Sequence, residues 1–214
     1  MPQETLSERS EHAATGRKTQ PRGRRSARKL LDTAMALFAA KGVEATTVDE
    51  IVDVAGLSKG TFYHHYDSKS ALLDALRAEF IRRFHEHING ALARCAKEDY
   101  ASQLESWVRA AIESYLELGE LHAIVFSGAD YLLWSASDEA FMGEFIAILE
   151  QGHRAGAWRV TDAHLTATFI LRGLLGVIDD RLLSGQDALS AWPTVAALVA
   201  ALVGLPGQVE PRQE

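Results

Sequence analysis

Five residues close together in the chain have groups suited to contact with nucleic acid: Lys59, Gly60, Thr61, Tyr63 and His64. Their ammonium, hydroxyl, phenol and imidazole groups donate hydrogen bonds to phosphates and base edges, and the glycine permits close approach. On a helix these residues mostly face outward, whereas Phe62 and Tyr66, at i and i+4, face inward. We therefore expect a helix with a donor-rich outer face, which suits a DNA major groove.

A second short helix is predicted just before this face. Apolar residues recur there at i, i+3, i+4 and i+7, the spacing of a buried helical stripe: Val48, Ile51, Val52 and Ala55. Thr47 precedes the stripe and Glu50 lies three residues later, which is the pattern of a capping box.

The turn between the two helices is marked by residues that favour it. Gly56 follows the stripe and readily takes the left-handed conformation that ends a helix. Leu57 fills the gap between the helices, and Ser58 suits the N-cap of the second one. A donor-rich helix held at an angle by a glycine turn is a helix-turn-helix, so we expect residues 47 to 69 to place their second helix in the major groove.

The same small domain gains a first helix from about Ser26 to Lys41, which Gly42 ends. Its apolar face is Leu30, Leu31, Ala34, Leu37 and Phe38. Residues 23 to 69 therefore make a complete DNA-binding domain, and residues 1 to 22 are expected to be a disordered tail. Basic residues at the junction either solubilise the chain or follow DNA as an arm: Arg17, Lys18, Arg22, Arg24 and Arg25.

The net charge of −7 is unevenly distributed along the 214 residues. Residues 17 to 69 carry ten Lys or Arg against six acids, a net charge of +4. Residues 1 to 16 sum to −2 and residues 70 to 214 to −9. Because attraction to phosphates acts locally, we expect double-stranded DNA to be bound at one end of the chain only.

A reducing, cytoplasmic location is expected, since the single cysteine, Cys95, cannot form an intrachain disulfide. The polar N-terminus lacks the apolar segment of a secretory signal. The longest uncharged apolar run, residues 188 to 208, is interrupted, and its cleanest part, 195 to 205, is too short to span a bilayer. We expect no membrane association.

Catalysis is not indicated by the ionisable residues. His85 and His87 flank Glu86, and Asp179 adjoins Asp180, but residues one or two apart do not share a helical face. No H-E-x-x-H sequence, Walker loop or G-x-S-x-G elbow occurs. We expect no catalytic residues, no metal site and no cofactor.

Residues 70 to 206 have helical periodicity and no strand-like alternation. We expect an all-α fold, in which the helix-turn-helix domain joins a C-terminal helical domain, and a disordered tail at 207 to 214. The first predicted C-terminal helix runs from Asp67 or Ser68 to about Cys95, and the second covers 99 to 121. One or two short helices are expected within 122 to 136. The last three helices are predicted at 138 to 156, 162 to 184 and 189 to 204.

The last helix is apolar almost all the way round, so its burial requires a central position in the fold or a second subunit. Glycines on the preceding helix would allow close helix approach. We favour a dimer, because helix-turn-helix proteins bind paired half-sites with two-fold symmetry. The candidate interface is Gly173, Gly176, Val195, Leu198, Val199 and Leu202.

Three segments together resemble the signature of the tetracycline-repressor (TetR) family of bacterial transcription regulators: TTVDEI at 46–51, AGLSKGTFYHHYDSK at 55–69 and ALL at 71–73. The resemblance covers about residues 26 to 80. Tyr66 stands where the family more often has Phe, and Ser70 where an acid is common. The resemblance to the family implies an all-α homodimer with a C-terminal ligand pocket. It also implies a four-helix dimer interface built from the last two helices of each subunit.

The resemblance also implies roles for single residues. Thr47 and the helix it begins would hold a phosphate, and Lys59 would reach guanine acceptors. Tyr63, His64 and Lys69 would hold backbone phosphates. His65 either contacts DNA or makes a structural hydrogen bond. The full set of DNA-binding candidates is Thr47, Ser58, Lys59, Gly60, Thr61, Tyr63, His64, His65 and Lys69.

The C-terminal domain is rich in large aromatic residues. Most such residues are core, and a cavity lined by some of them with a few polar groups would suit an apolar or aromatic small molecule. The candidate pocket residues are His87, Trp107, Tyr115, Phe126, Tyr131, Trp134, Phe145, Phe169 and Arg172.

The predicted mechanism is a ligand-gated repressor. A small-molecule effector that prefers one separation of the two recognition helices would shift the dimer away from operator-compatible spacing. The alternative is a DNA-bound adaptor whose C-terminal domain only dimerises or recruits a protein partner.

Overall fold

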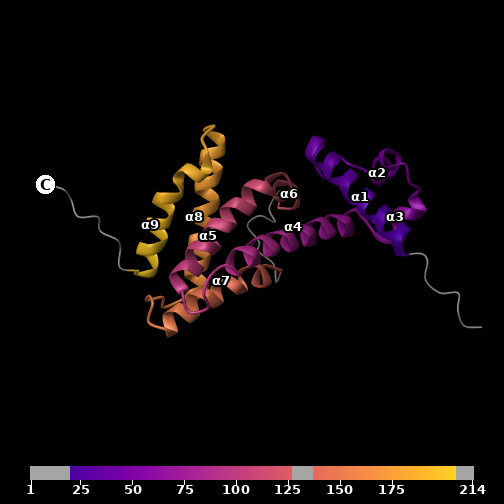
Figure 1. Cartoon of the computed structure of the whole chain (residues 1–214). Coiled ribbons are helices and arrows are strands. Elements are labelled where there is room, and N and C mark those ends of the chain that lie inside the picture. Colours follow the sequence, from indigo (N-terminus) through magenta and orange to yellow (C-terminus); the bar gives the residue numbers. More distant parts are fainter. Residues whose placement is uncertain (1–19, 127–136, 206–214) are drawn as a thin grey trace, which may run out of the picture. The chain divides into compact units, whose positions relative to one another are not determined.

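The computed structural model describes residues 20–126 and 137–205, with the main chain alone for residues 20–22 and 137–141. Within these residues every regular element is helical (Figure 1), which confirms the all-α prediction. The chain divides into two compact units between Leu72 and Leu73, whereas the sequence places the domain boundary at Lys69.

The first unit contains α1 (Gln20–Lys41), α2 (Val48–Ala55), α3 (Lys59–His65) and the start of α4 (Lys69–Leu92). Ser68 caps α4, since its hydroxyl accepts a hydrogen bond from the Ala71 amide at 3.0 Å. The sequence prediction for α1 was wrong at its start, because the helix already begins at Gln20 and part of the predicted tail is helical.

A small apolar core holds α1, α2 and α3 together. All of its members are 3% exposed or less: Leu30, Ala34, Phe38, Ile51, Val52, Ala55 and Phe62. Phe62 is fully buried and comes from the shortest helix, so it is the main anchor of α3. Truncating such a residue to Ala typically costs about 3 to 5 kcal/mol.

The second unit contains the rest of α4 and all later helices: α5 (Tyr100–Glu117), α6 (Gly119–Val125), α7 (Ser137–Arg154), α8 (Ala163–Leu183), the 3-10 helix η2 (Ala188–Ala191) and α9 (Trp192–Val203). The single helix predicted for 99 to 121 is two helices, because α5 ends at Glu117. The helix predicted for 189 to 204 is also divided, and Pro193 lies in the first turn of α9, where its missing N–H is harmless.

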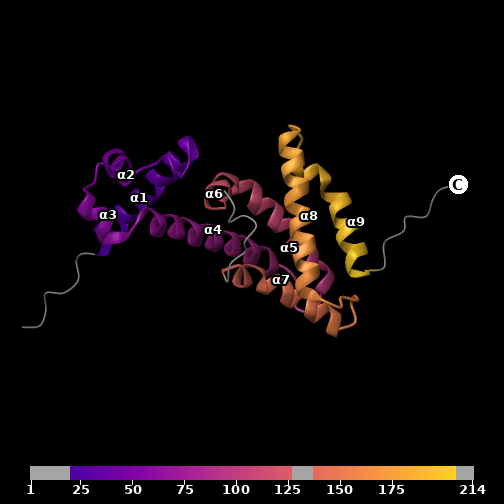
Figure 2. The ribbon, with the colours of Figure 1, turned by 180° about the vertical axis from the view of Figure 1, so that it is seen from behind.

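The core of the second unit is built around α5, which packs against α7. The rings of Trp107 and Phe145, both fully buried, are stacked with centroids 3.9 Å apart. On the other side α7 packs against α8, and α8 against α9. Figures 1 and 2 show α8 and α9 side by side.

The last two helices each carry an exposed apolar stripe. On α8 it comprises Leu165, Phe169, Gly173 and Gly176, which lie on one face at i, i+4, i+8 and i+11. On α9 it contains Leu198 and Leu202, which are 62% and 44% exposed. We call these surfaces the α8 stripe and the α9 stripe. Among the described residues no helix is both long and apolar enough to cross a membrane.

Candidate nucleic-acid interface and effector domain

The turn between α2 and α3 has the geometry that the sequence predicts. Gly56 adopts the left-handed conformation (φ 58°, ψ 42°), and its amide donates to the carbonyls of Asp53 and Val52. Ser58 is the N-cap of α3, since its hydroxyl accepts from the Thr61 amide at 3.1 Å. Both ends of the turn are therefore fixed by local hydrogen bonds.

The outer face of α3 is open to solvent. Lys59, Gly60, Tyr63 and His64 are all exposed, and 54% of Tyr63 is accessible. A β-carbon on Gly60 would make only an ordinary contact, 3.7 Å from Ser58 Oγ. The protein itself therefore does not require glycine there, which favours close approach by a partner as its reason.

Thr61 is turned partly away from this face. It is half-buried, and its hydroxyl lies 2.9 Å from Ser58 Oγ. Of the five residues predicted to face DNA from α3, Thr61 therefore takes part in the helix cap, and the other four are exposed.

Lys59 forms an ion pair within the protein. Its ammonium lies 2.6 Å from Asp49 Oδ1 on α2, and both side chains are more than half exposed. The hydrogen bond from the ammonium to Asp49 raises the pKa of Lys59 above its usual value. Exposed pairs of this kind contribute little to stability, so the lysine can exchange its partner for another anion.

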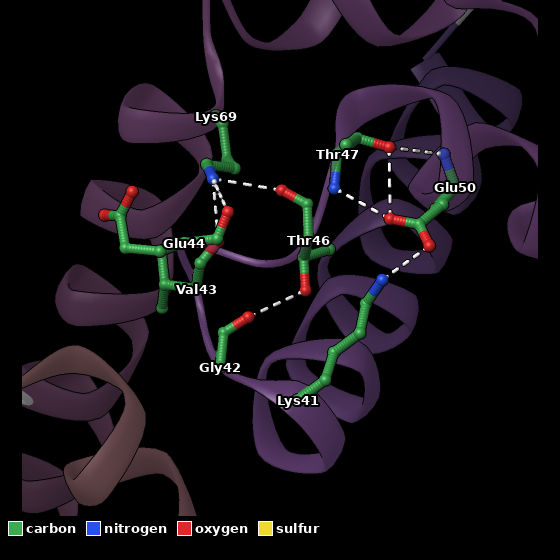
Figure 3. Close-up of polar contacts among 8 residues, drawn as sticks. All are labelled: Lys41, Gly42, Val43, Glu44, Thr46, Thr47, Glu50 and Lys69. Atoms are coloured by element: carbon green, nitrogen blue, oxygen red, sulfur yellow. Dashed lines mark hydrogen bonds and ion pairs between the residues drawn. The ribbon is translucent and has the colours of Figure 1, made fainter.

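The N-terminus of α2 is closed by a polar network (Figure 3). Thr47 Oγ1 accepts from the Glu50 amide, and the Thr47 amide donates to Glu50 Oε2 at 2.9 Å, so the predicted capping box is present. Lys41 from α1 donates to Glu50 Oε1 at 2.5 Å. The hydrogen bonds from Lys41 and from the Thr47 amide and hydroxyl lower the pKa of Glu50 to about 2.

Lys69, which was predicted to hold a phosphate, binds main-chain carbonyls of the protein instead. Its ammonium donates to three main-chain carbonyls between α1 and α2 (Figure 3), those of Val43 at 2.6 Å, Thr46 at 3.0 Å and Glu44 at 3.4 Å. A lysine ammonium has three N–H donors. All three are used inside the protein, which the sequence gives no local signal to predict.

His65 makes a structural hydrogen bond, the second of the two roles considered for it. Its Nε2 lies 2.9 Å from the Ser26 hydroxyl of α1, and the residue is half-buried. The hydroxyl of Tyr66 donates to the Ala27 carbonyl nearby at 3.4 Å. Ser26 and Ala27 therefore hold the end of α3 on α1, a contact across 39 residues that sequence spacing did not reveal.

The predicted basic arm is only partly described. Arg17 and Lys18 lie outside the described residues, and Arg22 belongs to α1. Arg24 and Arg25 are exposed in the first turns of α1. At least these two cations are held by a helix instead of by a free tail.

In the second unit, two of the predicted pocket residues lie around His122. The rings of Tyr115 and Phe126 lie 4.6 and 4.9 Å from the imidazole, and Phe80 lies 5.5 Å away. The Tyr115 hydroxyl donates to Asp179 Oδ1 of α8 at 2.9 Å. Burial lowers the pKa of His122 to about 4, and the charge of Asp179 opposes this shift. His122 is therefore neutral at pH 7.

The other predicted pocket residues are scattered. Trp107 and Phe145 are stacked in the core, as described above. Half-exposed His87 lies on α4, with Nε2 3.5 Å from Glu113 Oε2 and Nδ1 3.6 Å from Glu117 Oε2. Phe169 is 66% exposed on the α8 stripe, so other residues of the single chain do not enclose it, and its assignment to a pocket stays a prediction.

Three further pocket candidates can be placed only in part. Arg172 is half-buried on α8. Tyr131 and Trp134 lie outside the described residues.

Two buried polar atoms on α5 have no hydrogen-bond partner among the described residues, the indole Nε1 of Trp107 and the hydroxyl of Ser114. Both residues are fully buried. Buried polar groups are nearly always paired, since an unpaired one costs roughly 1 to 3 kcal/mol. Among the described residues no cluster of three His, Cys, Asp or Glu side chains suits a metal ion.

The predicted dimer residues fall into two classes. Gly173 and Gly176 are exposed, and a β-carbon on either would meet no atom of the other described elements within 4 Å. Leu198 and Leu202 are exposed on the α9 stripe. Val195 and Val199 are instead 5% and 9% exposed, because they face inward within the subunit. Their assignment to the interface stays a prediction.

The sequence matches that of known regulators. Residues 30–76 match the family described as bacterial regulatory proteins, tetR family. The chain is 35% identical over 152 residues to the HTH-type transcriptional repressor KstR2 of Rhodococcus jostii (strain RHA1). This match covers 64% of this chain and 69% of the relative. KstR2 of Mycobacterium tuberculosis (strain ATCC 25618 / H37Rv) is 46% identical over 52 residues, covering 24% of this chain and 26% of the relative.

Solved structures have the same fold. A tetR-family regulatory protein from Rhodococcus RHA1 superposes with a TM-score of 0.64 at 25% identity, covering 85% of this chain and 98% of the other. The fatty acid degradation regulator FadR from Bacillus halodurans gives 0.68 at 20% identity, covering 90% and 100%. With the helix-turn-helix, its exposed α3 face and the extended match to KstR2, this chain belongs to the tetR family and is a DNA-binding transcriptional repressor.

Proposed function

We propose that the protein is a homodimeric repressor that binds a double-stranded operator through α3 of each subunit and is released by a small apolar or aromatic effector. The observation that carries the DNA-binding part is the exposed α3 face, held between the Gly56 turn and the buried Phe62. Such a helix presents its donors to base edges while its other side remains packed. The repressor would act in the cytoplasm, where bacterial DNA lies.

Individual contacts follow from exposure. Lys59 and Gly60 would lie in the major groove, with Lys59 exchanging Asp49 for guanine or phosphate oxygens. Tyr63 and His64 would hold backbone phosphates, which position the protein without specifying sequence. Thr47, at the capped end of α2, would meet a phosphate through the helix N-terminus.

Homodimerisation is supported by the α8 and α9 stripes. Exposed apolar residues at regular helical spacing, on two neighbouring helices, are typical of an interface that a partner covers. Gly173 and Gly176 remove side-chain bulk from the α8 stripe, so a second helix can approach closely. A two-fold axis there would give the paired recognition helices that a two-part operator needs.

Effector binding is supported by α5. Trp107 Nε1 can only donate a hydrogen bond, and Ser114 Oγ, seven residues later, lies on the same side of the helix. An effector with a hydrogen-bond acceptor on an apolar frame would satisfy the indole, and the aromatic rings around His122 would suit the frame.

The test is an operator selection followed by an effector titration. Bound sequences selected from random duplex DNA should share a two-part site with half-site centres about 34 to 36 Å apart. Candidate effectors are then added while operator binding and Trp fluorescence are recorded. An effector that releases DNA with a saturable fluorescence change supports the proposal.

Two results would count against parts of the proposal. A single, undivided half-site would contradict the dimeric operator. Operator binding that no apolar compound changes, together with capture of a protein partner by the second unit, would favour the adaptor role instead.

A further inference from the structure

The connection between α1 and α2 has a compact hydrogen-bonded form. Gly42 ends α1 in the left-handed conformation, with φ 86°. Thr46 is 1% exposed, its hydroxyl donates to the Gly42 carbonyl at 2.8 Å, and its amide donates to the Val43 carbonyl at 3.3 Å. Three carbonyl oxygens of this connection, those of Val43, Glu44 and Thr46, face one point.

The ammonium of Lys69 occupies that point. Lys69 is the first residue of α4, and it lies 23 to 26 residues along the chain from the carbonyls that it binds. Its contact with the Val43 carbonyl is 2.6 Å long, as expected for a charge-assisted hydrogen bond. Since the carbonyl dipoles converge on a half-buried cation, none of the three donors remains for a DNA phosphate in this arrangement.

We propose that Lys69 is a positioning residue for DNA binding, which fixes the start of α4 to the α1–α2 connection and so sets where α2 begins. Thr47, the N-cap of α2, directly follows Thr46, so a displacement of the connection displaces the capped end of α2. α2 in turn holds α3 through the Gly56 turn. Lys69 thus acts on DNA through the placement of the recognition helix and makes no contact with phosphate.

A positioning role and a phosphate contact predict different salt dependence. Loss of one phosphate contact lowers the slope of log affinity against log salt by about 0.9. Loss of a positioning contact leaves the number of phosphates bound unchanged, so the slope stays the same. It weakens operator binding more than random-duplex binding, because base contacts depend most on the orientation of α3.

The experiment uses the full chain and compares Lys69→Met and Lys69→Arg with wild type. Lys97→Met, an exposed lysine between α4 and α5, controls for the loss of one positive charge. Affinity for the selected operator and for random duplex DNA is measured at several salt concentrations, at a temperature where circular dichroism shows full helix content. We expect Lys69→Met to lose operator affinity about tenfold, with an unchanged salt slope and a lower ratio of operator to random binding.

The arginine variant separates the two roles further. Arg binds phosphate at least as well as Lys but presents a planar fork of donors, which does not match three carbonyls converging on one atom. We therefore expect Lys69→Arg to remain impaired. Recovery of wild-type affinity in Lys69→Arg, or a slope lowered by about 0.9 in Lys69→Met, would overturn the proposal in favour of phosphate contact.

A second variant alters the same α1–α2 connection without changing Lys69. Thr46→Val removes the hydroxyl that donates to the Gly42 carbonyl and keeps all charges, so it should also lower the operator-to-random ratio without changing the slope. If both variants lose operator and random binding equally, Lys69 does not set the placement of α3 and the positioning role is excluded. The wild-type protein binds operator in every outcome, so failure here leaves the DNA-binding function standing.

Discussion

The indole ring of Trp158 occupies the position where any side chain on Gly152 would begin. A β-carbon on Gly152 would lie 2.0 Å from Trp158 Cζ2 and 2.3 Å from Cε2. The indole is itself fixed, since Nε1 donates to the Leu149 carbonyl at 2.8 Å and the ring is 3% exposed. This close approach folds the segment after α7 back onto the helix.

Gly152→Ala should therefore destabilise the second unit, although Ala is the better helix former. Steric overlap in a packed core typically costs about 1 to 3 kcal/mol. Gly143→Ala is the matched control on α7, where a β-carbon would meet nothing within 4 Å in the described part of the chain, and it should stabilise by up to about 1 kcal/mol. Urea unfolding of both variants checks this. Equal stability of the two would show that Trp158 moves away without penalty.

The stability of the second unit should fall in acid because of His122. Its pKa is lowered to about 4 in the folded protein, below the ordinary value near 6.5 expected when unfolded. Folding thus favours the neutral ring, and this contribution is complete above about pH 6.5 and is lost as the pH falls towards 4. The loss should be roughly 2 kcal/mol, since partial exposure screens part of the effect.

His122→Phe measures this contribution, because carboxylates titrate in the same range in both proteins. The difference in unfolding free energy between wild type and variant should change between pH 7 and pH 4.5, as determined by urea titration. His164→Asn, an exposed histidine on α8, should show no such change. A pH-independent difference for His122→Phe would mean that the ring is not kept neutral by burial.

Leu198→Glu should weaken the proposed dimer. Leu198 is 62% exposed on the α9 stripe, and a carboxylate there would have to be desolvated when a partner covers it. We expect dissociation to begin at concentrations at least about tenfold higher than for wild type, measured by sedimentation or light scattering. Val54→Glu is the control, since Val54 is 65% exposed on α2 in the other unit. Identical dimer stability for both variants would exclude the α9 stripe.

Lys59→Ala should relax base preference and reduce the salt slope of operator binding by about 0.9. Tyr63→Phe should weaken binding across all sequences with little change in slope, because it removes a hydroxyl and no charge. Fluorescence anisotropy with the selected operator and single-base variants distinguishes these outcomes. Unchanged binding in both variants would remove α3 from the interface.

Local features of the helix-turn-helix could be predicted because they depend on neighbours in sequence. The Thr47–Glu50 capping box, the Gly56 turn and the Ser58 cap each follow from residue types within four positions. The buried stripes of α1 and α2 follow from helical periodicity in the same way.

Contacts between distant segments could not be predicted from spacing. The Lys69 ammonium binds carbonyls, which carry no residue-type signal, and the Ser26–His65 bond spans 39 residues. The exposure of Phe169 was not predicted, because α8 is apolar on two sides and periodicity does not say which side faces the subunit's own core. For the same reason the sequence did not separate buried Val195 from exposed Leu198 on α9.

In the proposed DNA complex, Lys59 would exchange its ion pair with Asp49 for a contact with DNA. Without DNA, its ammonium already pairs with a carboxylate of the same chain. Random DNA offers this lysine phosphate in place of carboxylate and no base contacts, so little is gained. Operator DNA would replace the Asp49 carboxylate in the same way and would also provide base contacts. In the proposed complex, the Asp49 carboxylate would compete with DNA phosphate for Lys59. This competition would weaken binding to random DNA, and base contacts would then decide the affinity for the operator.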